Sequence, residues 1–277
     1  MTLPPFLIRF SAVLSLLCQF CTYSSGQNGN YQMGARSTGM GGASIAVSDA
    51  WSLFNNPAGV AEVETSNVLF GYQNRYSIAS LSNLGLGFIH PTAVGHLGLS
   101  AFRFGDELFS EQKIAATFSN RIGIVALGAT LNYVQFRIEG LGTRSFPTFD
   151  FGGIVSFREK LMIGAHISNI NQGRVSKAED EQLPTIMRLG FSYRPLKSLY
   201  LNAEVEKDLD FDEILKVGIE YNFYKKLFVR TGIQTQPFQS RFGIGFQPNR
   251  VSLDYAFGDN PTLGNLHEVS VGYSLKK

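Results

Sequence analysis

Three side chains with the residue types for nucleophilic or acid–base chemistry are predicted to lie on one face of two neighbouring strands. His166 and Ser168 are two residues apart in an alternating stretch, so both project from the same face of a predicted strand. Asp150 faces the same way on the neighbouring predicted strand, which completes the residue types of a Ser-His-Asp set. No G-x-S-x-G motif surrounds the serine, and alternation often brings such trios together by chance. Polar residues lining an inner sheet face are the commoner explanation, and the sequence predicts a protein that is not an enzyme.

Metal and cofactor sites have no support in the residue spacing. The other histidines, His90, His96 and His267, are scattered and do not form a ligand pattern. Cys18 and Cys21 both lie near the start of the chain. The glycines that precede residue 43 have neither the G-x-G-x-x-G spacing nor a P-loop lysine. We therefore expect no metal, no nucleotide and no cofactor.

The elements that would position these residues are strands with an apolar face and a wet face. In Leu215 to Phe223 every odd position is apolar, while the even positions are Lys216, Gly218, Glu220 and Asn222. The same alternation recurs over residues 199–206, 251–257 and 268–275. A soluble sandwich alternates in the same way, so this pattern alone does not identify the solvent on the apolar face.

The chain from Asn67 onward divides into about fourteen such strands, an even number as in bacterial barrels. Alternate connections are short, as at Asn120-Arg121, and the intervening ones are longer, as from Asn171 to Pro184. Phe102 and Phe104 are out of phase with Leu97 and Leu99, which predicts a bulge near residues 98–101. The predicted strands cover residues 67–74, 80–90, 96–104, 111–119, 122–138, 147–157, 161–170, 184–194, 199–207, 213–223, 227–235, 240–247, 250–258 and 266–275.

Aromatic residues recur at the ends of these strands, where rings favour the boundary between lipid and water. The predicted lower girdle consists of Phe88, Phe118, Phe157, Tyr193, Tyr221 or Phe223, Phe246 and Tyr273. Phe104, Phe136 and Phe257 are expected to begin the upper girdle. These aromatics are instead core residues if the chain is a soluble sandwich. The even strand count and the paired turn lengths favour a barrel.

Residues 1–26 have the features of a secretory signal: Arg9, a short apolar stretch, and small residues before Gln27. We therefore predict a signal peptide over 1–26, a glycine-rich plug segment over 27–66 and an outer-membrane β-barrel over 67–277. Charged residues make up 17% of the chain, below the usual quarter for soluble domains. Without Arg9, 23 basic residues stand against the 22 acidic ones, which argues against a nucleic-acid partner. The fold class expected is all-β, a transmembrane antiparallel barrel in the bacterial outer membrane, in contact with its lipid.

Charged side chains within the strands must face the lumen, because a Lys or Arg on the lipid face at mid-membrane costs about 2–4 kcal/mol. The predicted lumen charges are Arg188, Glu204, Lys216, Glu220, Arg230, Arg241 and Asp254. They form either a packed set of ion pairs or the lining of a narrow polar passage. Periodicity leaves both possibilities open.

The segment before the first strand has its own signals. Gly39, Gly41 and Gly42 permit close backbone approach, as when a segment passes along the inside of a barrel wall. Asp49 is placed to cap a short helix that runs from Ala50 toward Asn55. The Asn56-Pro57 pair ends that helix, because a residue before proline is disfavoured in the helical region.

The sequence from Ala35 to Gly59, A-R-S-x-G-M-G-G-A-S-x-A-x-x-D-x-W-S-x-F-N-N-P-A-G, resembles the start of the PorV/PorQ outer-membrane proteins of Bacteroidota. These are relatives of the FadL fatty-acid transporters, which share the Asn-Pro-Ala element. The resemblance implies a fourteen-stranded barrel with an N-terminal segment in or near the lumen. The matching motif includes Gly39, Gly41, Gly42, Asp49, Trp51, Asn56, Pro57 and Ala58, which the resemblance assigns to the plug region and the segment leading into it.

Two functions follow from that resemblance. A PorV/PorQ-like member is a non-catalytic component of type IX secretion or surface attachment, with other secretion or attachment proteins as partners. A FadL-like member instead lets hydrophobic small molecules such as fatty acids diffuse through its wall, and the predicted kink near Gly98 is a candidate opening. The chain is shorter than either kind of relative and its outer loops are trimmed. The sequence favours the first function and retains the second as the alternative.

Overall fold

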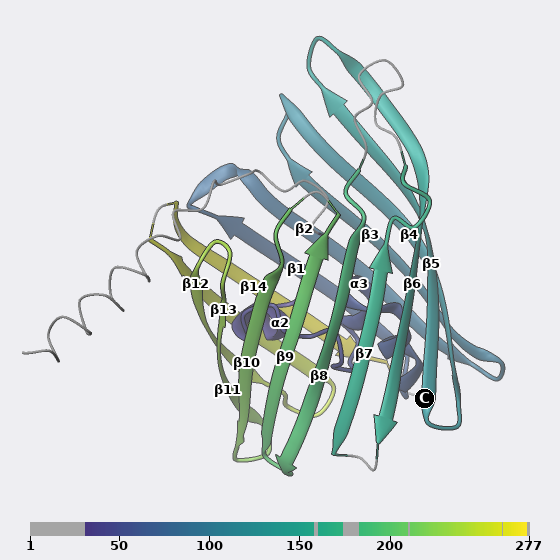
Figure 1. Ribbon diagram of the computed structural model, residues 1–277, viewed down its shortest axis with the longest axis vertical. Coiled ribbons are helices and arrows are strands. Elements are labelled where there is room, and N and C mark those ends of the chain that lie inside the picture. The colour runs from purple at the N-terminus through teal and green to yellow at the C-terminus, as the bar shows by residue number, and fades with distance from the viewer. Residues whose placement is uncertain (1–30, 158–159, 174–182, 210, 262, 276–277) are drawn as a thin grey trace, which may run out of the picture.

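The wall of the protein is a closed cylinder of fourteen antiparallel strands in which each strand pairs with its sequence neighbours and β1 pairs with β14 (Figure 1). The computed structural model describes residues 31–157, 160–173, 183–209, 211–261 and 263–275. The strands are β1 (Asn67–Arg75), β2 (Ile78–Thr92), β3 (Gly95–Gly105), β4 (Phe109–Ile122), β5 (Val125–Ile138), β6 (Gly142–Phe157), β7 (Leu161–Ser168), β8 (Ile186–Leu196), β9 (Leu199–Asp208), β10 (Ile214–Phe223), β11 (Leu227–Gln234), β12 (Gln239–Phe246), β13 (Val251–Asn260) and β14 (Gly264–Ser274). The predicted fold class is confirmed.

Burial alternates along the strands with period two. On β10, Lys216 and Glu220 are 3% and 0% exposed, whereas Val217 and Tyr221 are 46% and 45% exposed. Apolar side chains on the outside and charged ones on the inside are the reverse of a water-soluble sheet protein. Hydrocarbon is therefore the solvent of the outer face.

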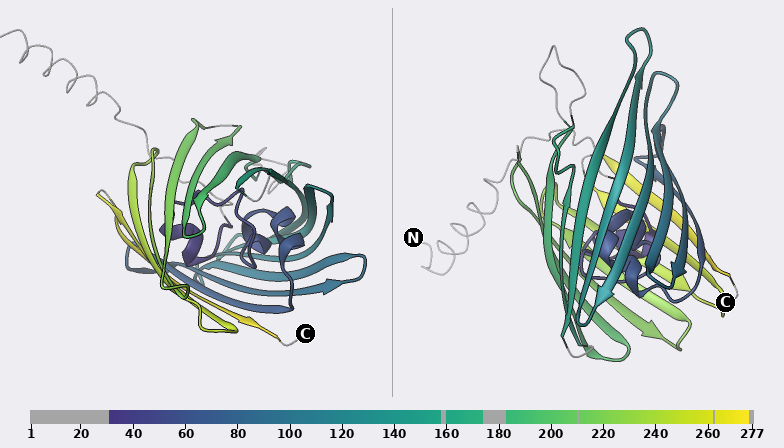
Figure 2. Two further views of the ribbon diagram at one scale, coloured as in Figure 1. Left: turned by 90° about the horizontal axis from the view of Figure 1, so that it is seen from below. Right: turned by 90° about the vertical axis from the view of Figure 1, so that its right-hand side faces the viewer.

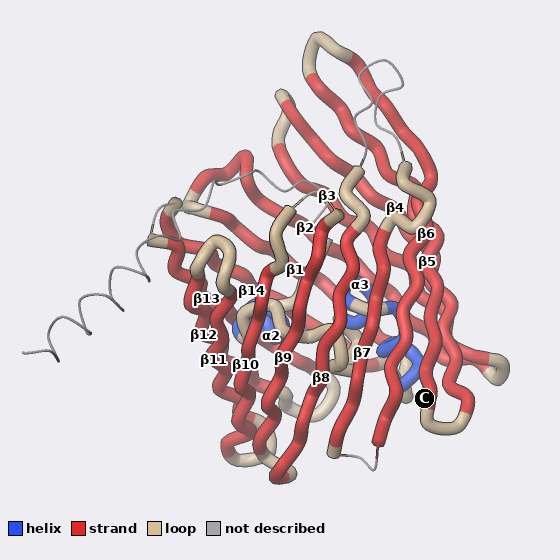
Figure 3. Tube along the Cα trace, viewed as in Figure 1, coloured by secondary structure: helices blue, strands red, loops and turns tan. Residues whose placement is uncertain are grey.

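Three short helical elements lie inside the cylinder: α2 (Ala35–Gly39), α3 (Ser52–Asn55) and the 3₁₀ helix η1 (Pro57–Glu62). Figure 2 shows this N-terminal segment, in purple, surrounded by the strands, and Figure 3 shows its helices in blue within the red wall. None of the helices in the described residues has the length and apolar character needed to cross a membrane. We call residues 31–66 the plug. The predicted signal peptide, residues 1–26, lies outside the described residues.

The end of the barrel with the short turns and the start of β1 is the periplasmic end, following the usual asymmetry of these barrels. The predicted lower girdle lies there, and each of its aromatic side chains is exposed on the outer face: Phe88, Phe118, Phe157, Tyr193, Tyr221, Phe223, Phe246 and Tyr273. At the other end the wall is uneven. The 14-residue β4 and β5 and the 16-residue β6 form the tall hairpins at the top of Figure 1, whereas β7 has only eight residues.

The bulge expected near residues 98–101 is absent, because β3 keeps an unbroken register with both β2 and β4. Phe102 is out of phase with Leu97 for a different reason: its side chain faces the lumen and is 4% exposed. The prediction was wrong because it assumed that every phenylalanine on a strand faces lipid. The wall opening expected at Gly98 is also absent, because Gly98 pairs with Ile89 on β2 and with Thr117 on β4.

The expected upper girdle is wrong for the same reason. Phe136 is 5% exposed and packs inside the barrel, and Phe104 packs against the buried residues of the lumen. Only Phe257 of the three lies beside an outward-facing partner, His267, with ring centroids 5.4 Å apart. The inward phenylalanines belong to the candidate functional site.

Candidate functional site

The plug touches the inner wall backbone to backbone. A side chain added at Gly39 would begin 2.9 Å from the Cα of Gly243 on β12, and one at Gly41 would begin 2.8 Å from the backbone of Ile233 on β11. Gly41 and Gly42 also have positive φ angles, 70° and 84°, which side chains other than glycine rarely adopt. The loop after α2 therefore lies as close to the strands as peptide groups allow.

The wall supplies its own glycines at the same contacts. On strands β1 to β3, β5 to β8 and β10 to β12, a side chain added at an inward-facing glycine would meet plug atoms. These wall glycines are Gly71, Gly85, Gly87, Gly98, Gly128, Gly152, Gly164, Gly190, Gly218, Gly232 and Gly243. Their number shows that the plug is seated against most of the circumference, so the lumen is filled at this height.

Asn56, Pro57 and Ala58 hold the second half of the plug together. The fully buried Asn56 donates from Nδ2 to the carbonyl of Ile45 at 2.7 Å, and its Oδ1 accepts from the backbone N–H of Ala58 at 3.2 Å. Pro57 opens η1, where its missing N–H is not needed. Ala58 packs with Ala126 and Ile154 of the wall. This element thus ties two turns of the plug to each other and to β5 and β6.

Asp49 and Trp51 fix the short helix α3. Asp49 accepts from the backbone N–H of Ser52 at 3.1 Å, but α3 begins at Ser52 and not at the expected Ala50, and its N-cap residue is Trp51. Its second carboxylate oxygen lies 3.0 Å from Nη1 of Arg36. Trp51 is 4% exposed and packs with Met33, Phe54 and their neighbours in the largest buried apolar cluster.

Three of the predicted lumen charges gather around Arg36 on the periplasmic side of the plug. Arg36 donates to both carboxylate oxygens of Glu220, at 2.8 and 2.6 Å. Arg230, 1% exposed, donates to Glu220 and to Asp254, each at 2.6 Å. Burial disfavours the charged form of Arg36, but Glu220 and Asp49 outweigh it and raise its pKa above the ordinary value, so it stays protonated. We call these residues the lower ion cluster.

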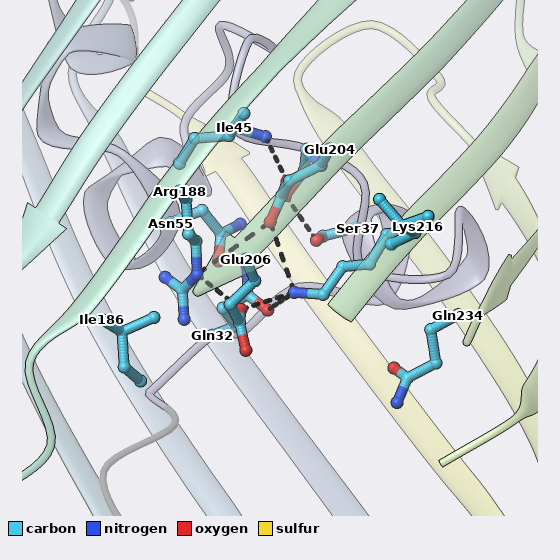
Figure 4. A network of polar contacts seen from close by, with 12 residues as sticks. Gln32, Ser37, Ile45, Asn55, Ile186, Arg188, Glu204, Glu206, Lys216 and Gln234 are labelled. Atoms are coloured by element: carbon cyan, nitrogen blue, oxygen red, sulfur yellow. Dashed lines mark hydrogen bonds and ion pairs between the residues drawn. The ribbon is translucent and has the colours of Figure 1, made fainter. Parts of the chain in front are cut away.

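Three more of the predicted lumen charges gather on the outer side of the plug, in the network of Figure 4: Arg188, Glu204 and Lys216. Lys216 lies 2.6 Å from Glu206 and 3.3 Å from Glu204, and Arg188 lies 2.7 Å from Glu206. Glu204 also accepts from the backbone N–H groups of Ser44 and Ile45, both at 2.9 Å. The wall carboxylate thus accepts hydrogen bonds that the plug backbone must make. We call Arg188, Glu204, Glu206 and Lys216 the upper ion cluster, and it holds the plug loop from its outer side.

Arg241 belongs to neither cluster. Its Nη2 donates to the side-chain oxygens of Gln234 and Gln239, both at 2.8 Å. A further wall carboxylate, Glu268, was not singled out from the sequence although it lies on the polar side of its strand. Glu268 accepts from the backbone N–H of Gly34 at 2.7 Å and from the hydroxyl of Thr38. The sequence signal that could have identified Glu268 is an acidic residue at an inward-facing strand position, in a barrel that holds a glycine-rich segment in its lumen.

Beyond the plug, the outer lumen has an aromatic side that sequence reasoning missed. Phe104 and Phe109 have ring centroids 6.2 Å apart, Phe109 and Phe136 6.3 Å, and Phe136 and Phe146 6.0 Å. The aromatic ladder, as we call it, comprises Phe102, Phe104, Phe109, Phe136 and Phe146 on β3 to β6, with Tyr31 of the plug, Val134 and Leu183 packed against it. Inward positions of an open channel are normally polar, so this apolar stripe marks the site.

Tyr31 joins the ladder to charged residues. Its ring meets Phe102 edge-on at 5.2 Å, and its hydroxyl donates to Glu111. The ammonium group of Lys113 lies 4.0 Å from the Tyr31 ring centroid, a cation–π contact. Tyr31 of the plug therefore lies between the aromatic ladder and two buried charged residues of the wall, Glu111 and Lys113.

The Ser-His-Asp set does not assemble. Ser168 donates its hydroxyl hydrogen to the carbonyl of Ile186 at 3.4 Å, and Asp150 accepts from Asn132 and from the backbone N–H of Asn169, both at 2.9 Å. Nδ1 of His166 has no hydrogen-bond partner among the described residues. Within the same residues no group of three His, Cys, Asp or Glu side chains is arranged as metal ligands.

Comparisons with known proteins show which solved structures have a similar fold. No protein-family model matches the chain, and no curated protein sequence matches it. Among solved structures, the CymD monoaromatic hydrocarbon channel is similar, with a TM-score of 0.65 and 13% identity over 91% of this chain and 100% of that one. The Pseudomonas putida toluene transporter TodX is similar with a TM-score of 0.67 and 12% identity, over 90% of this chain and 99% of that one.

These similarities correct the preferred function. The expectation of a PorV/PorQ-like role in type IX secretion or attachment is wrong, because CymD and TodX, which share this fold over almost their whole length, are hydrocarbon channels. The comparisons do not show secretion proteins as partners. The chain has the fold of the outer-membrane monoaromatic hydrocarbon channels, and its place is the bacterial outer membrane.

Proposed function

We propose that the protein is a passive channel that admits small hydrophobic molecules, aromatic ones in particular, through the outer membrane. The aromatic ladder carries the proposal. Phe104, Phe109 and Phe146 are only partly buried, so each leaves ring surface facing the outer lumen. A hydrophobic solute that covers such surface gains about 25 cal/mol for each Å² removed from water.

The similar structures support the same class of solute, since CymD and TodX are described as a monoaromatic hydrocarbon channel and a toluene transporter. The filled lumen supports a selective route over a general pore. Ions and sugars meet a plug held by two ion clusters and by backbone contacts to the wall glycines. A hydrophobic solute is instead concentrated on the outer side of that plug.

The direct test is entry of naphthalene into liposomes whose outer leaflet is lipopolysaccharide, which slows hydrophobic solutes. The purified protein is expected to accelerate naphthalene entry and to leave glucose entry unchanged. Equal naphthalene entry with and without protein, or glucose entry as fast as naphthalene entry, would contradict the proposal. Fluorescence of the trapped naphthalene provides the measurement.

Replacing Phe104 and Phe146 together with serine is expected to slow naphthalene entry about thirtyfold, because each lost ring removes a contact worth on the order of 1 kcal/mol. Leu141→Ser is the matched control: Leu141 lies at the tip of the β5–β6 hairpin and is 78% exposed, away from the ladder. The initial rate of entry is measured for all three proteins at equal reconstituted density. A double variant as fast as the native protein would remove the ladder from the route.

A further inference from the structure

The short turns along one side of the periplasmic end carry basic side chains. The turns that follow β8, β10 and β12 contain no Asp or Glu but contain Lys197, Lys225, Lys226 and Arg250. Arg194 near the end of β8 and Lys160 in the turn after β6 extend this basic set, and we call the six residues the basic arc. Backbone hydrogen bonds link neighbouring turns: Arg194 N–H donates to the Lys160 carbonyl at 2.7 Å, and Gln247 N–H to the Lys226 carbonyl at 2.8 Å. The arc is therefore continuous around part of the rim.

A groove lies in the middle of the basic arc. A cavity of about 460 Å³ separates the β8–β9 turn from the β10–β11 turn, and its lining is Lys197, Ser198, Asn222, Tyr224 and Lys225. Both lysines are exposed, and neither makes an ion pair with a described residue. The side-chain oxygen of Asn222 is buried and has no hydrogen-bond partner among the described residues. Two free cations and an unused polar group thus face one groove.

The groove lies at the level where the lipid headgroups begin. Tyr193, Tyr221 and Phe223, which lie near the periplasmic ends of β8 and β10, are exposed on the outer face as part of the lower girdle. The ring of Tyr224 meets that of Phe223 edge-on at 4.6 Å and is itself 84% exposed. Aromatic rings concentrate at this boundary, so the lysines stand beside the phosphate layer of the periplasmic leaflet.

We propose that this groove binds the headgroup of an anionic glycerophospholipid from the periplasmic leaflet. The ammonium groups of Lys197 and Lys225 pair with the phosphate, and the hydroxyl of Ser198 bonds to a headgroup hydroxyl. The acyl chains then follow the apolar outer faces of β9 and β10, where Val205, Val217 and Ile219 are exposed. A polar acidic protein segment fits less well, because the exposed rings of Tyr221, Phe223 and Tyr224 beside the groove favour the membrane boundary. The site is independent of the solute route inside the barrel.

The test is a titration of delipidated protein with phosphatidylglycerol, followed by native mass spectrometry, with phosphatidylcholine and a poly-glutamate peptide as comparison ligands. The native protein is expected to prefer phosphatidylglycerol. Lys197→Gln with Lys225→Gln is expected to weaken that binding about 5- to 25-fold, from roughly a fivefold effect for each basic residue near an anionic surface. Binding of phosphatidylcholine should stay unchanged.

Arg121→Gln is the matched control, because Arg121 lies at the periplasmic end of β4 and already pairs with Glu62 at 2.7 Å. Heat-modifiable migration on a gel shows that each variant still forms its barrel. Equal phosphatidylglycerol affinity in the native and double-variant proteins would overturn the proposal. So would a native protein that binds both phospholipids equally, or that binds only the peptide. None of these results depends on solute transport.

Discussion

Replacing Gly232 with valine is expected to convert the insulating barrel into an ion-conducting pore. A side chain at this position on β11 would overlap the carbonyl carbon of Met40 and the nitrogen of Gly41 in the plug. Backbone atoms cannot move aside by changing a side-chain rotamer, so the plug loop must move away from β11. An emptied fourteen-stranded lumen is wide enough for water, and single-channel conductance should rise by on the order of tenfold or more. Planar bilayers with purified protein provide the measurement.

Gly153→Val is the control for that experiment. Gly153 lies on β6, and a side chain added there would meet only Cδ2 of Leu127, at 3.5 Å, and a carbonyl oxygen at 3.9 Å. It should leave conductance at the native level. Displacement of the plug is checked separately by maleimide labelling of a cysteine introduced at Thr38, which is 6% exposed in the seated plug. A folded Gly232→Val barrel that neither conducts nor labels at this position would show that the wall, and not the plug, gives way.

Replacing Arg230 with methionine is expected to be the most destabilising single change in the lower ion cluster. Arg230 is fully buried and is the only ion-pair partner of Asp254 among the described residues, whereas Glu220 keeps Arg36. Removing one partner of a buried pair leaves an uncompensated charge, which costs about 3–5 kcal/mol. The midpoint of guanidinium-induced unfolding in lipid vesicles should fall accordingly.

The double variant Arg230→Met with Asp254→Asn separates charge from packing. It removes the orphaned carboxylate, so it should regain part of the stability lost in the single variant. Arg121→Met provides the scale for an exposed pair: its contact with Glu62 is partly solvated, and pairs of this kind contribute about 0–1 kcal/mol. If Arg230→Met costs no more than Arg121→Met, the cluster does not anchor the fold.

The strand pattern was predictable because hydrocarbon on one side and a wet lumen on the other impose a period of two. Val217 and Tyr221 face lipid and Lys216 and Glu220 face inward for that reason, and no knowledge of their partners is needed. Phenylalanine breaks the rule. Phe102 and Phe136 were assigned outward because an apolar side chain normally seeks lipid, yet they face a lumen that is apolar on one side.

The amino-acid sequence by itself determined the barrel, its number of strands and the face on which the charged and aliphatic strand residues lie. Only the tertiary structure decided which inward residues meet across the lumen. Arg36 and Arg230 share Glu220 although they are far apart in sequence, and β3 to β6 bring together phenylalanines that no local pattern connects. The physical reason is that alternation specifies a side of the sheet, whereas contacts across a closed cylinder depend on its register and on the segment that fills it.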